Sequence, residues 1–342
     1  MKENMKLAAR LSVAPMMDWT DRHCRYFHRL MSRRALLYTE MVTSAALVRG
    51  GAMHLLAHDP AEAPVAVQLG GSEPAELAQA ARIAADEGFA EVNLNVGCPS
   101  DRVQSGCFGA VLMQRPELVA DCVAAMAAAA PQAEITVKCR IGVDDQIPQE
   151  VLPQFLERIA AAGVRRVIIH ARKAWLQGLS PRENREVPPL DHDLVLGMKA
   201  AFPQLHVSLN GGIETLEQAQ AHLARGMDGV MLGRAGYHRP YDVLAGADAA
   251  IWGDTAAPLS REEVVAAMRP YIARHLGQGG RLHSVTRHML GLYAGQPGAR
   301  AWRRALSEGA VQPGAGLEML DAALAAQAEA AAGGATLMAA RA

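Results

Sequence analysis

Short apolar segments recur along the first two-thirds of the chain, and a segment with helical periodicity follows most of them. Each apolar segment is only a few residues long and nearly continuous in apolar character, which is typical of strands buried on both faces of a parallel sheet. The pattern therefore predicts a series of strands. They are Leu11–Pro15, Leu36–Glu40, Val65–Leu69, Val92–Asn95, Ile135–Lys138, Val167–His170, His206–Asn210 and Gly229–Gly233.

The segments between these strands carry helix signals, and several of them end at a glycine. Eight strands that alternate with helices over about 240 residues predict an α/β fold, the (β/α)8 TIM barrel. The rival fold is a doubly wound open sheet, which is weakened because no GxGxxG sequence follows the first strand. The clearest helical segments are Glu73–Asp86, Pro116–Ala130, Glu150–Ala162 and Glu214–Arg225.

The pattern changes at Asp254–Ser260, where polar, alanine and proline residues interrupt it, and only helical segments follow. We therefore expect residues 1–253 to form the barrel domain and residues 254–342 to form a small C-terminal helical domain. The chain after Gly333 is expected to fray. The helices expected in this second domain are Arg261–Leu276, Gly280–Leu292, Ala299–Ser307 and Leu317–Ala332.

The composition is that of an ordinary soluble globular protein, with 50% hydrophobic and 20% charged residues. The sequence has no run of apolar residues long enough to predict a membrane span. The apolar stretch that follows Lys2 and Lys6 ends at Asp18, and it lacks the length and cleavage site of a secretory signal. We therefore expect a cytoplasmic protein that does not enter a membrane.

The net charge of −1 does not by itself indicate a protein that binds nucleic acid. The distribution of the charge is uneven, because arginines greatly outnumber the two glutamates, Glu262 and Glu263, between Arg261 and Arg304. Positive charge is thus concentrated near the C-terminal end of the chain.

The five cysteines are an odd number, and no CxxC pair occurs among them. A disulfide framework or a zinc site is therefore not expected, and no other metal site is predicted. Single cysteines in a reducing compartment are either packed in the core or reactive. Cys98 is the candidate for a reactive thiol, because Gly97 and Pro99 place it in an irregular loop directly after a predicted strand.

In a barrel of this type the active site lies at the carboxyl ends of the strands. Two glycine-containing strand ends, Asn210-Gly211-Gly212 and Gly233-Arg234, match the phosphate site that forms after strands seven and eight. Glycines let backbone N–H groups approach an anion, and Arg234 would add positive charge. The alternative interpretation is two tight turns that connect a strand to a helix.

Lys138 lies within an otherwise apolar strand, and a buried ammonium group is costly unless it has a partner. A flavin would provide one, because its N1–C2=O edge gains negative charge on reduction. Gln68 offers both a donor and an acceptor to the edge of a planar ring, and His170 is a candidate to hold a phosphate or a base edge. The alternative for Lys138 is a structural ion pair with Glu40 or Asp18.

The strand ends carry a set of short motifs that together form a specific pattern. They are Ala14–Asp21, Glu40-Met41, Gln68–Gly71, Asn93–Ser100, Lys138–Gly142, His170–Arg172, Asn210–Ile213 and Gly233-Arg234. This set resembles the tRNA-dihydrouridine synthases, and the resemblance runs from about Leu11 to about Leu306.

Further motifs are similar to the A-type bacterial subgroup of this family, which modifies uridines 20 and 20a of the tRNA D-loop. One departure is Cys139, where that pattern has Thr or Met. Because Cys139 lies between Lys138 and Arg140 on a strand, we expect its side chain to point away from the site. The motifs of the subgroup are Thr20–Phe27, His170–Trp175, Gly178–Arg185, Thr286–Gly291 and Pro297–Arg304.

The resemblance implies that FMN binds at the top of the barrel and takes a hydride from NADPH. Reduced flavin then passes a hydride to C6 of uridine, and Cys98 protonates C5 from the opposite face. The residues implied to hold FMN are Pro15, Met16, Met17, Gln68, Lys138, His170, Asn210, Gly211, Gly212, Gly233 and Arg234.

The resemblance also implies that tRNA is the partner and that the helical domain binds its backbone. A D-loop base must leave its stack to reach a barrel pocket. No protein partner is implied. The residues that match tRNA-contacting positions are Asn95, Arg182, Arg185, Arg300 and Arg303.

Two other functions remain open on the sequence alone. A flavin barrel that acts on a free pyrimidine, similar to a dihydroorotate dehydrogenase, explains the flavin residues but not the basic C-terminal helices. A tRNA-binding or chaperone protein without catalysis requires a lost site, although Cys98, Lys138 and His170 are all present.

Overall fold

The computed structural model describes residues 3–104 and 106–339. By their contacts, the residues group into two compact units. The first unit contains the chain up to Thr20, Arg34–Ile213 and Glu217–Gly233, and the second contains Asp21–Arg33, Glu214–Leu216 and the chain from Arg234. By contacts, residues 234–253 belong to the second unit. The division into a barrel domain that ends at residue 253 and a helical domain that begins at residue 254 stays a prediction.

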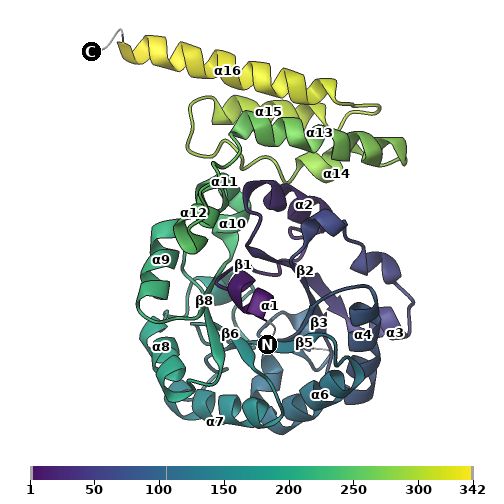
Figure 1. The fold of residues 1–342 in the computed structure, drawn as a ribbon, viewed down its shortest axis with the longest axis vertical. Helices are drawn as coiled ribbons and strands as arrows, with labels where there is room; N and C mark the ends of the chain where they lie inside the picture. Colours follow the sequence, from purple (N-terminus) through teal and green to yellow (C-terminus); the bar gives the residue numbers. More distant parts are fainter. Residues whose placement is uncertain (1–2, 105, 340–342) are drawn as a thin grey trace. The chain divides into compact units, whose positions relative to one another are not determined.

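The first unit is a closed barrel in which each strand pairs in parallel with the next and β8 pairs with β1 (Figure 1). All eight predicted strands are confirmed, and the open sheet is excluded because the barrel closes. The strands are nearly continuous in apolar residues because one face of each strand points into the barrel and helices cover the other face. The strands are β1 (Leu11–Val13), β2 (Leu36–Thr43), β3 (Val65–Gly70), β4 (Glu91–Val96), β5 (Glu134–Arg140), β6 (Arg166–His170), β7 (His206–Asn210) and β8 (Gly229–Leu232).

Helices surround this barrel, and their ends follow local sequence signals (Figure 1). Proline occupies the first helical position of α4, α6 and α7, where its missing N–H costs nothing. Gly163 follows α7 with a φ of 101°, a left-handed conformation that suits glycine. The helices of the first unit are α1 (Glu3–Ala8), α3 (Ser44–Val48), α4 (Pro74–Asp86), α5 (Asp101–Gln104), α6 (Pro116–Ala129), α7 (Pro148–Ala161), α8 (His192–Ala201) and α9 (Leu216–Ala224), with 3-10 turns η1 (Met53–Leu56), η2 (Pro60–Glu62), η3 (Gly109–Gln114) and η4 (Glu183–Arg185).

An apolar plug closes the end of the barrel where the strands begin. Met5 and Ala8 of α1 are buried against Tyr38, Ile168 and Met231, which come from three different strands. In Figure 1, α1 lies over the middle of the barrel. The opposite end, where the strands finish, is therefore the end available for a site.

The second unit is helical throughout its described length apart from turns. Asp21 caps α2 by accepting the N–H groups of His23 and Cys24, and Ser260 and Glu263 form a capping box at the start of α13. Helix α16 continues beyond Gly333 to Ala339. The helices are α2 (Arg22–Met31), α10 (Arg234–His238), α11 (Pro240–Leu244), α12 (Ala247–Trp252), α13 (Arg261–Gly277), α14 (Leu282–Thr286), α15 (Ala299–Gly309) and α16 (Glu318–Ala339).

The helix expected at Gly280–Leu292 is wrong in its extent, because α14 ends at Thr286. The indole N–H of Trp302 donates to the carbonyl oxygen of Met289 at 3.0 Å, so that carbonyl is engaged outside any helix. Trp302 is fully buried, and after Thr286 the chain continues in turns, in which Met289 donates its N–H to Thr286 and accepts the N–H of Leu292.

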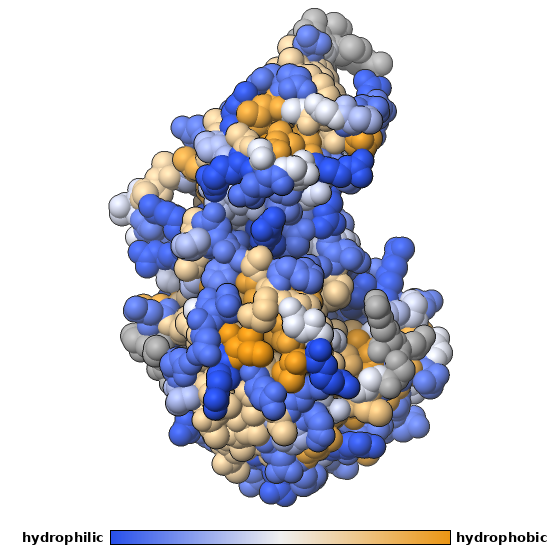
Figure 2. All heavy atoms as spheres, turned by 90° about the vertical axis from the view of Figure 1, so that its right-hand side faces the viewer, coloured by the Kyte–Doolittle hydropathy of each residue, from blue (hydrophilic) through white to orange (hydrophobic). Residues whose placement is uncertain are grey.

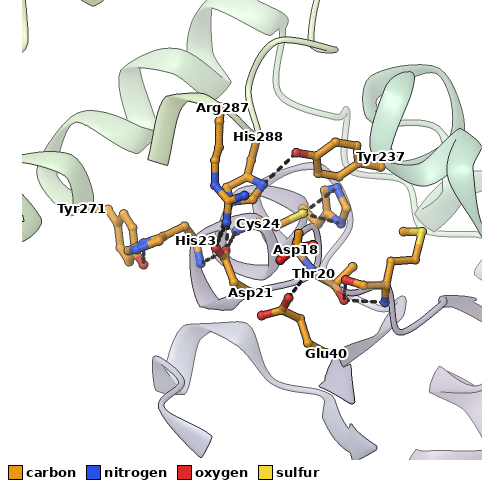
Figure 3. A network of polar contacts seen from close by, with 12 residues as sticks. Asp18, Thr20, Asp21, His23, Cys24, Glu40, Tyr237, Tyr271, Arg287 and His288 are labelled. Carbon is orange, nitrogen blue, oxygen red and sulfur yellow. Dashed lines mark hydrogen bonds and ion pairs between the residues drawn. The ribbon is translucent and has the colours of Figure 1, made fainter. Parts of the chain in front are cut away.

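A polar cluster around Asp21 joins α2 to the segment after α14 within this unit (Figure 3). Arg287 donates to Asp21 Oδ2 at 2.6 Å, and His288 Nε2 lies 3.0 Å from the same carboxylate. Burial opposes the ionisation of Asp21, but the bonds and charge of His288 outweigh it and lower the pKa of this carboxyl. His288 Nδ1 lies 3.2 Å from the Tyr237 hydroxyl, so both ring nitrogens have partners.

Hydrophobic side chains on the face shown in Figure 2 form small groups separated by hydrophilic ones. Within residues 3–104 and 106–339, no helix is long and apolar enough to cross a membrane.

Candidate active site at the carboxyl ends of the strands

Cys98 lies on a turn that Asn95 holds in place. Asn95 is at the end of β4, and its Oδ1 atom accepts the backbone N–H groups of Gly97 and Cys98, each at 3.0 Å. The carbonyl oxygen of Cys98 accepts the N–H of Ala110 at 2.9 Å. The half-buried thiol lies 3.4 Å from the hydroxyl oxygen of Ser100. These contacts fix the backbone on both sides of the thiol.

Arg140 supports the same turn from β5. Its Nε atom donates to the carbonyl oxygen of Gly97 at 3.1 Å, and its Nη1 atom donates to the carbonyl oxygen of Asn184 at 3.0 Å. Burial, and then the charges of nearby arginines, lower its pKa to about 10, so Arg140 stays charged at neutral pH. This role of Arg140 was not predicted from the sequence. Arg140 lies two positions beyond the predicted strand Ile135–Lys138, and its alternation with Lys138 was the available signal.

Lys138 contacts an amide instead of a carboxylate. Its Nζ atom donates to Asn210 Oδ1 at 3.0 Å, and Asn210 Nδ2 donates to the carbonyl oxygen of Met231 at 2.8 Å. The contacts of Lys138 therefore favour this amide partner over the alternative, an ion pair with Glu40 or Asp18. Burial and then the charge of Arg140 lower the pKa of Lys138 to about 8. An anionic group beside this ammonium would favour its charged form and so oppose both effects.

His170 ends β6 next to the glycine pair after β7. A Cβ atom at Gly211 would lie 3.2 Å from His170 Nε2, and Gly211 and Gly212 have left-handed φ values of 108° and 72°. Burial and the charges of Arg140 and Lys138 hold the pKa of His170 far below its usual value, so the ring is neutral. Its buried Nδ1 atom has no hydrogen-bond partner among the described residues. A bound ligand is one partner that such an atom can have.

Gln68, on β3, is buried in the barrel wall beside Asn95. Its Oε1 atom accepts from Asn95 Nδ2 at 2.8 Å, and its Nε2 atom donates to Asn93 Oδ1 at 2.8 Å. The structure therefore brings Gln68, Asn95 and Cys98 into one hydrogen-bonded group.

The loop after β1 carries the remaining candidates near the N-terminus. Pro15 and Met16 are half-buried, and the side chain of Met17 is 56% exposed. The hydroxyl of Thr20 donates to the Met16 carbonyl oxygen and accepts its N–H, which tightens the loop (Figure 3). Asp18 adopts a left-handed φ of 64°, and its N–H donates to the carboxylate of Glu40. Glu40 thus holds a strained turn in place.

The other predicted residues belong to different segments. Burial and then neighbouring charges, that of Arg185 among them, lower the pKa of Arg140 and of His170. Gly233 follows β8 in the first unit, whereas Arg234 opens α10 of the second. Arg182 and Arg185 are exposed at η4, and Arg182 Nε lies 3.6 Å from Glu186. In the second unit, Arg300 and Arg303, the two predicted tRNA contacts, are exposed on α15. Trp302, which lies between them in the sequence, is buried.

The arrangement combines three chemical capabilities. A thiol on a rigid turn can transfer a proton. The side-chain amides of Gln68 and Asn95 can hydrogen-bond a planar ring, and Lys138 and Arg140 supply positive charge near Cys98. In residues 3–104 and 106–339, no group of three or more His, Cys, Asp or Glu side chains is arranged to hold a metal ion.

Comparison with known proteins gives one consistent result. The family described as "Dihydrouridine synthase (Dus)" matches residues 12–329. The tRNA-dihydrouridine(20/20a) synthase of Shewanella oneidensis is 57% identical over 318 residues, which are 93% of this chain and 94% of that protein. The protein of the same name from Vibrio cholerae is 54% identical, over 94% of this chain and 97% of its own length. The one from Escherichia coli K12 is 55% identical, over 94% of this chain and 93% of its own length. The chain belongs to the dihydrouridine synthase family.

Proposed function

We propose that this protein reduces the C5=C6 bond of uridine to 5,6-dihydrouridine at positions 20 and 20a of the tRNA D-loop. The observation that carries the proposal is the Cys98 turn, because a thiol held by Asn95 and Arg140 at the end of β4 is suited to donate a proton. The identity of 53–57% to proteins named tRNA-dihydrouridine(20/20a) synthase supports the substrate and its positions.

FMN is the cofactor that the residues fit. The Nδ1 atom of His170 is free to form a hydrogen bond with a flavin, and the ammonium of Lys138 would attract its negatively charged edge. Gln68 can hydrogen-bond the edge of the planar ring. The glycine turn after β7 offers backbone N–H groups to a phosphate. A bound FMN would supply hydride transfer from NADPH to C6 of uridine. The remaining proposed contacts are Pro15, Met16, Met17, Asn210, Gly211, Gly212, Gly233 and Arg234.

The protein's own residues then act on the other carbon. The Sγ–H of Cys98 gives its proton to C5, on the face opposite to the hydride, and solvent restores the thiol. Asn95 and Arg140 hold the turn in place before the reaction, so no further conformational entropy is lost in ordering the thiol during the proton transfer. Asn95 is also proposed to contact the target base. The proposed contacts to the rest of the tRNA are Arg182, Arg185, Arg300 and Arg303.

The rival function is the reduction of a free pyrimidine. The exposed arginines of α15 favour tRNA, because a free base has no phosphate backbone for them to bind. The test is to supply the purified holoprotein and NADPH with either unmodified tRNA or free uridine and uracil. A loss of uridine absorbance in the reaction with tRNA, without a loss in the reactions with free uridine or uracil, supports the proposal. Turnover of the free pyrimidine at the faster rate would overturn it.

A further inference from the structure

A chain of hydrogen bonds runs inside the barrel from the Cys98 turn to a buried ion pair. The links below Asn95 are Asn95 to Gln68, Gln68 to Asn93, and Asn93 Nδ2 to Thr136 Oγ1, each at 2.8 Å. Thr136 Oγ1 then donates to Glu91 Oε1, also at 2.8 Å. Strand register explains the path, because Asn93 is aligned with Gln68 on one side and with Thr136 on the other.

The lower end of this chain is a carboxylate that can only accept. Arg166 Nη1 lies 2.7 and 2.8 Å from the two oxygens of Glu91, and the two side chains are 0% and 1% exposed. The hydroxyl of Tyr38 also donates to Glu91. An ionised carboxylate has no proton to give, so the Thr136 hydroxyl must donate to it and must accept from Asn93.

The upper end can only donate. The backbone N–H groups of Gly97 and Cys98 both require an acceptor, which fixes the oxygen of Asn95 toward them. Because both ends are determined, the amides of Asn95, Gln68 and Asn93 have a single consistent orientation, in which each donates one N–H to the next member on the way to Glu91. All members except Asn95, which is 8% exposed, are at most 1% exposed, so water does not compete with the chain.

We propose that Glu91, Asn93 and Thr136 are positioning residues that set the orientation of the Gln68 and Asn95 amides and thereby hold the Cys98 turn. Gln68 and Asn95 each keep one N–H that the chain does not use, so the pair presents donors that match carbonyl oxygens. Only this last point rests on the proposed function, since it concerns the rings that the amides would face.

Thr136 is the residue at which the chain can be broken with a matched control. Thr136→Val keeps the shape and removes the hydroxyl, whereas Thr136→Ser keeps the hydroxyl and removes a methyl group. The readout is the rate at which iodoacetamide alkylates Cys98, relative to the exposed Cys107 in the same chain without added cofactor or RNA. We expect Thr136→Val to raise this ratio about fivefold as the turn loosens and Thr136→Ser to leave it within about twofold. Thr136→Ala, which removes the same hydroxyl, replaces Thr136→Val if that variant does not fold.

A double-mutant cycle separates action through the chain from general loosening of the barrel. Asn95→Ala removes the last link, so Thr136→Val should add less than about twofold to the alkylation ratio in that background. The same increase with and without Asn95, or no increase from either hydroxyl-free variant, would overturn the inference. Because the measurement needs neither flavin nor tRNA, its result stands apart from any failure of the proposed function.

Discussion

The side-chain oxygen of Asn95 accepts the backbone N–H of Cys98 at 3.0 Å. This bond ties the residue proposed to donate a proton to the end of a buried strand, so the thiol is placed by the barrel and not by a flexible loop. The same amide continues through Gln68 into the barrel interior. From Gln68 the hydrogen bonds continue to Asn93, Thr136 and Glu91, so the geometry of the proposed site depends on three residues that are not proposed to contact a ligand.

Flavin affinity should depend on the charge of Lys138. Burial lowers its pKa from 10.5 to about 8, so in the protein without flavin the ammonium is present below that pH and is lost as the pH rises through it. We expect the affinity for FMN to fall above pH 8 by up to about tenfold per pH unit. Fluorescence quenching of FMN, titrated from pH 7 to about pH 9.5, measures this affinity.

Lys138→Met is the control for this pH profile. Its affinity should be weaker at pH 7 and nearly constant up to pH 9.5, where Arg140, with a pKa lowered to about 10, is still largely charged. A profile in Lys138→Met with the same fall as the unaltered protein would assign the titration to another group.

The ion pair of Arg166 and Glu91 should matter strongly to stability. Both side chains are buried, at 0% and 1% exposure, and removing one partner leaves an unpaired charge in the interior. Arg166→Met should therefore lower the free energy of unfolding by about 3–5 kcal/mol, as measured by urea denaturation.

The exposed pair of Arg158 and Glu117 gives a matched comparison, because these side chains are 54% and 69% exposed. Arg158→Met should cost no more than about 1 kcal/mol. Equal losses of stability in the two variants would show that burial of the Arg166 pair has no special weight.

The arginines of α15 should contribute to the salt dependence of tRNA binding. Arg300→Ala combined with Arg303→Ala should weaken binding and reduce the slope of log K against log salt by about 1 to 2. Arg269→Ala is the control within the same unit, because Arg269 already pairs with Asp321 at 2.7 Å. Filter binding between about 50 and 200 mM salt gives both slopes. A double variant with an unchanged slope would contradict a phosphate-binding role for these two residues.

The barrel could be predicted from the sequence because each strand is a short run of apolar residues, and the strand ends then indicated where a site would lie. Two hydrogen bonds join predicted site residues in pairs: Asn95 bonds to Gln68, and Lys138 bonds to Asn210. The length of α14 could not be predicted, because the segment after it makes contacts with residues distant in the sequence, Asp21 and Trp302.

The interior chain could not be predicted either. Asn93 and Thr136 are single polar residues within apolar runs, and only the pairing and register of β4 and β5 bring them together. The pairing of Glu91 with Arg166 joins positions on strands that are not neighbours, β4 and β6. Local patterns contain no information on such contacts.

The central claim is that Cys98 donates a proton during the reduction of D-loop uridines. The measurement is mass spectrometry of nuclease fragments from unmodified tRNA after incubation with NADPH and the flavin-loaded protein. We expect two added hydrogens at uridines 20 and 20a with the unaltered protein and with Cys107→Ala. We expect a rate lower by about 10²–10⁴ with Cys98→Ala, although flavin and tRNA still bind. Full turnover by Cys98→Ala, or no reduced uridine with the unaltered protein, would contradict the claim.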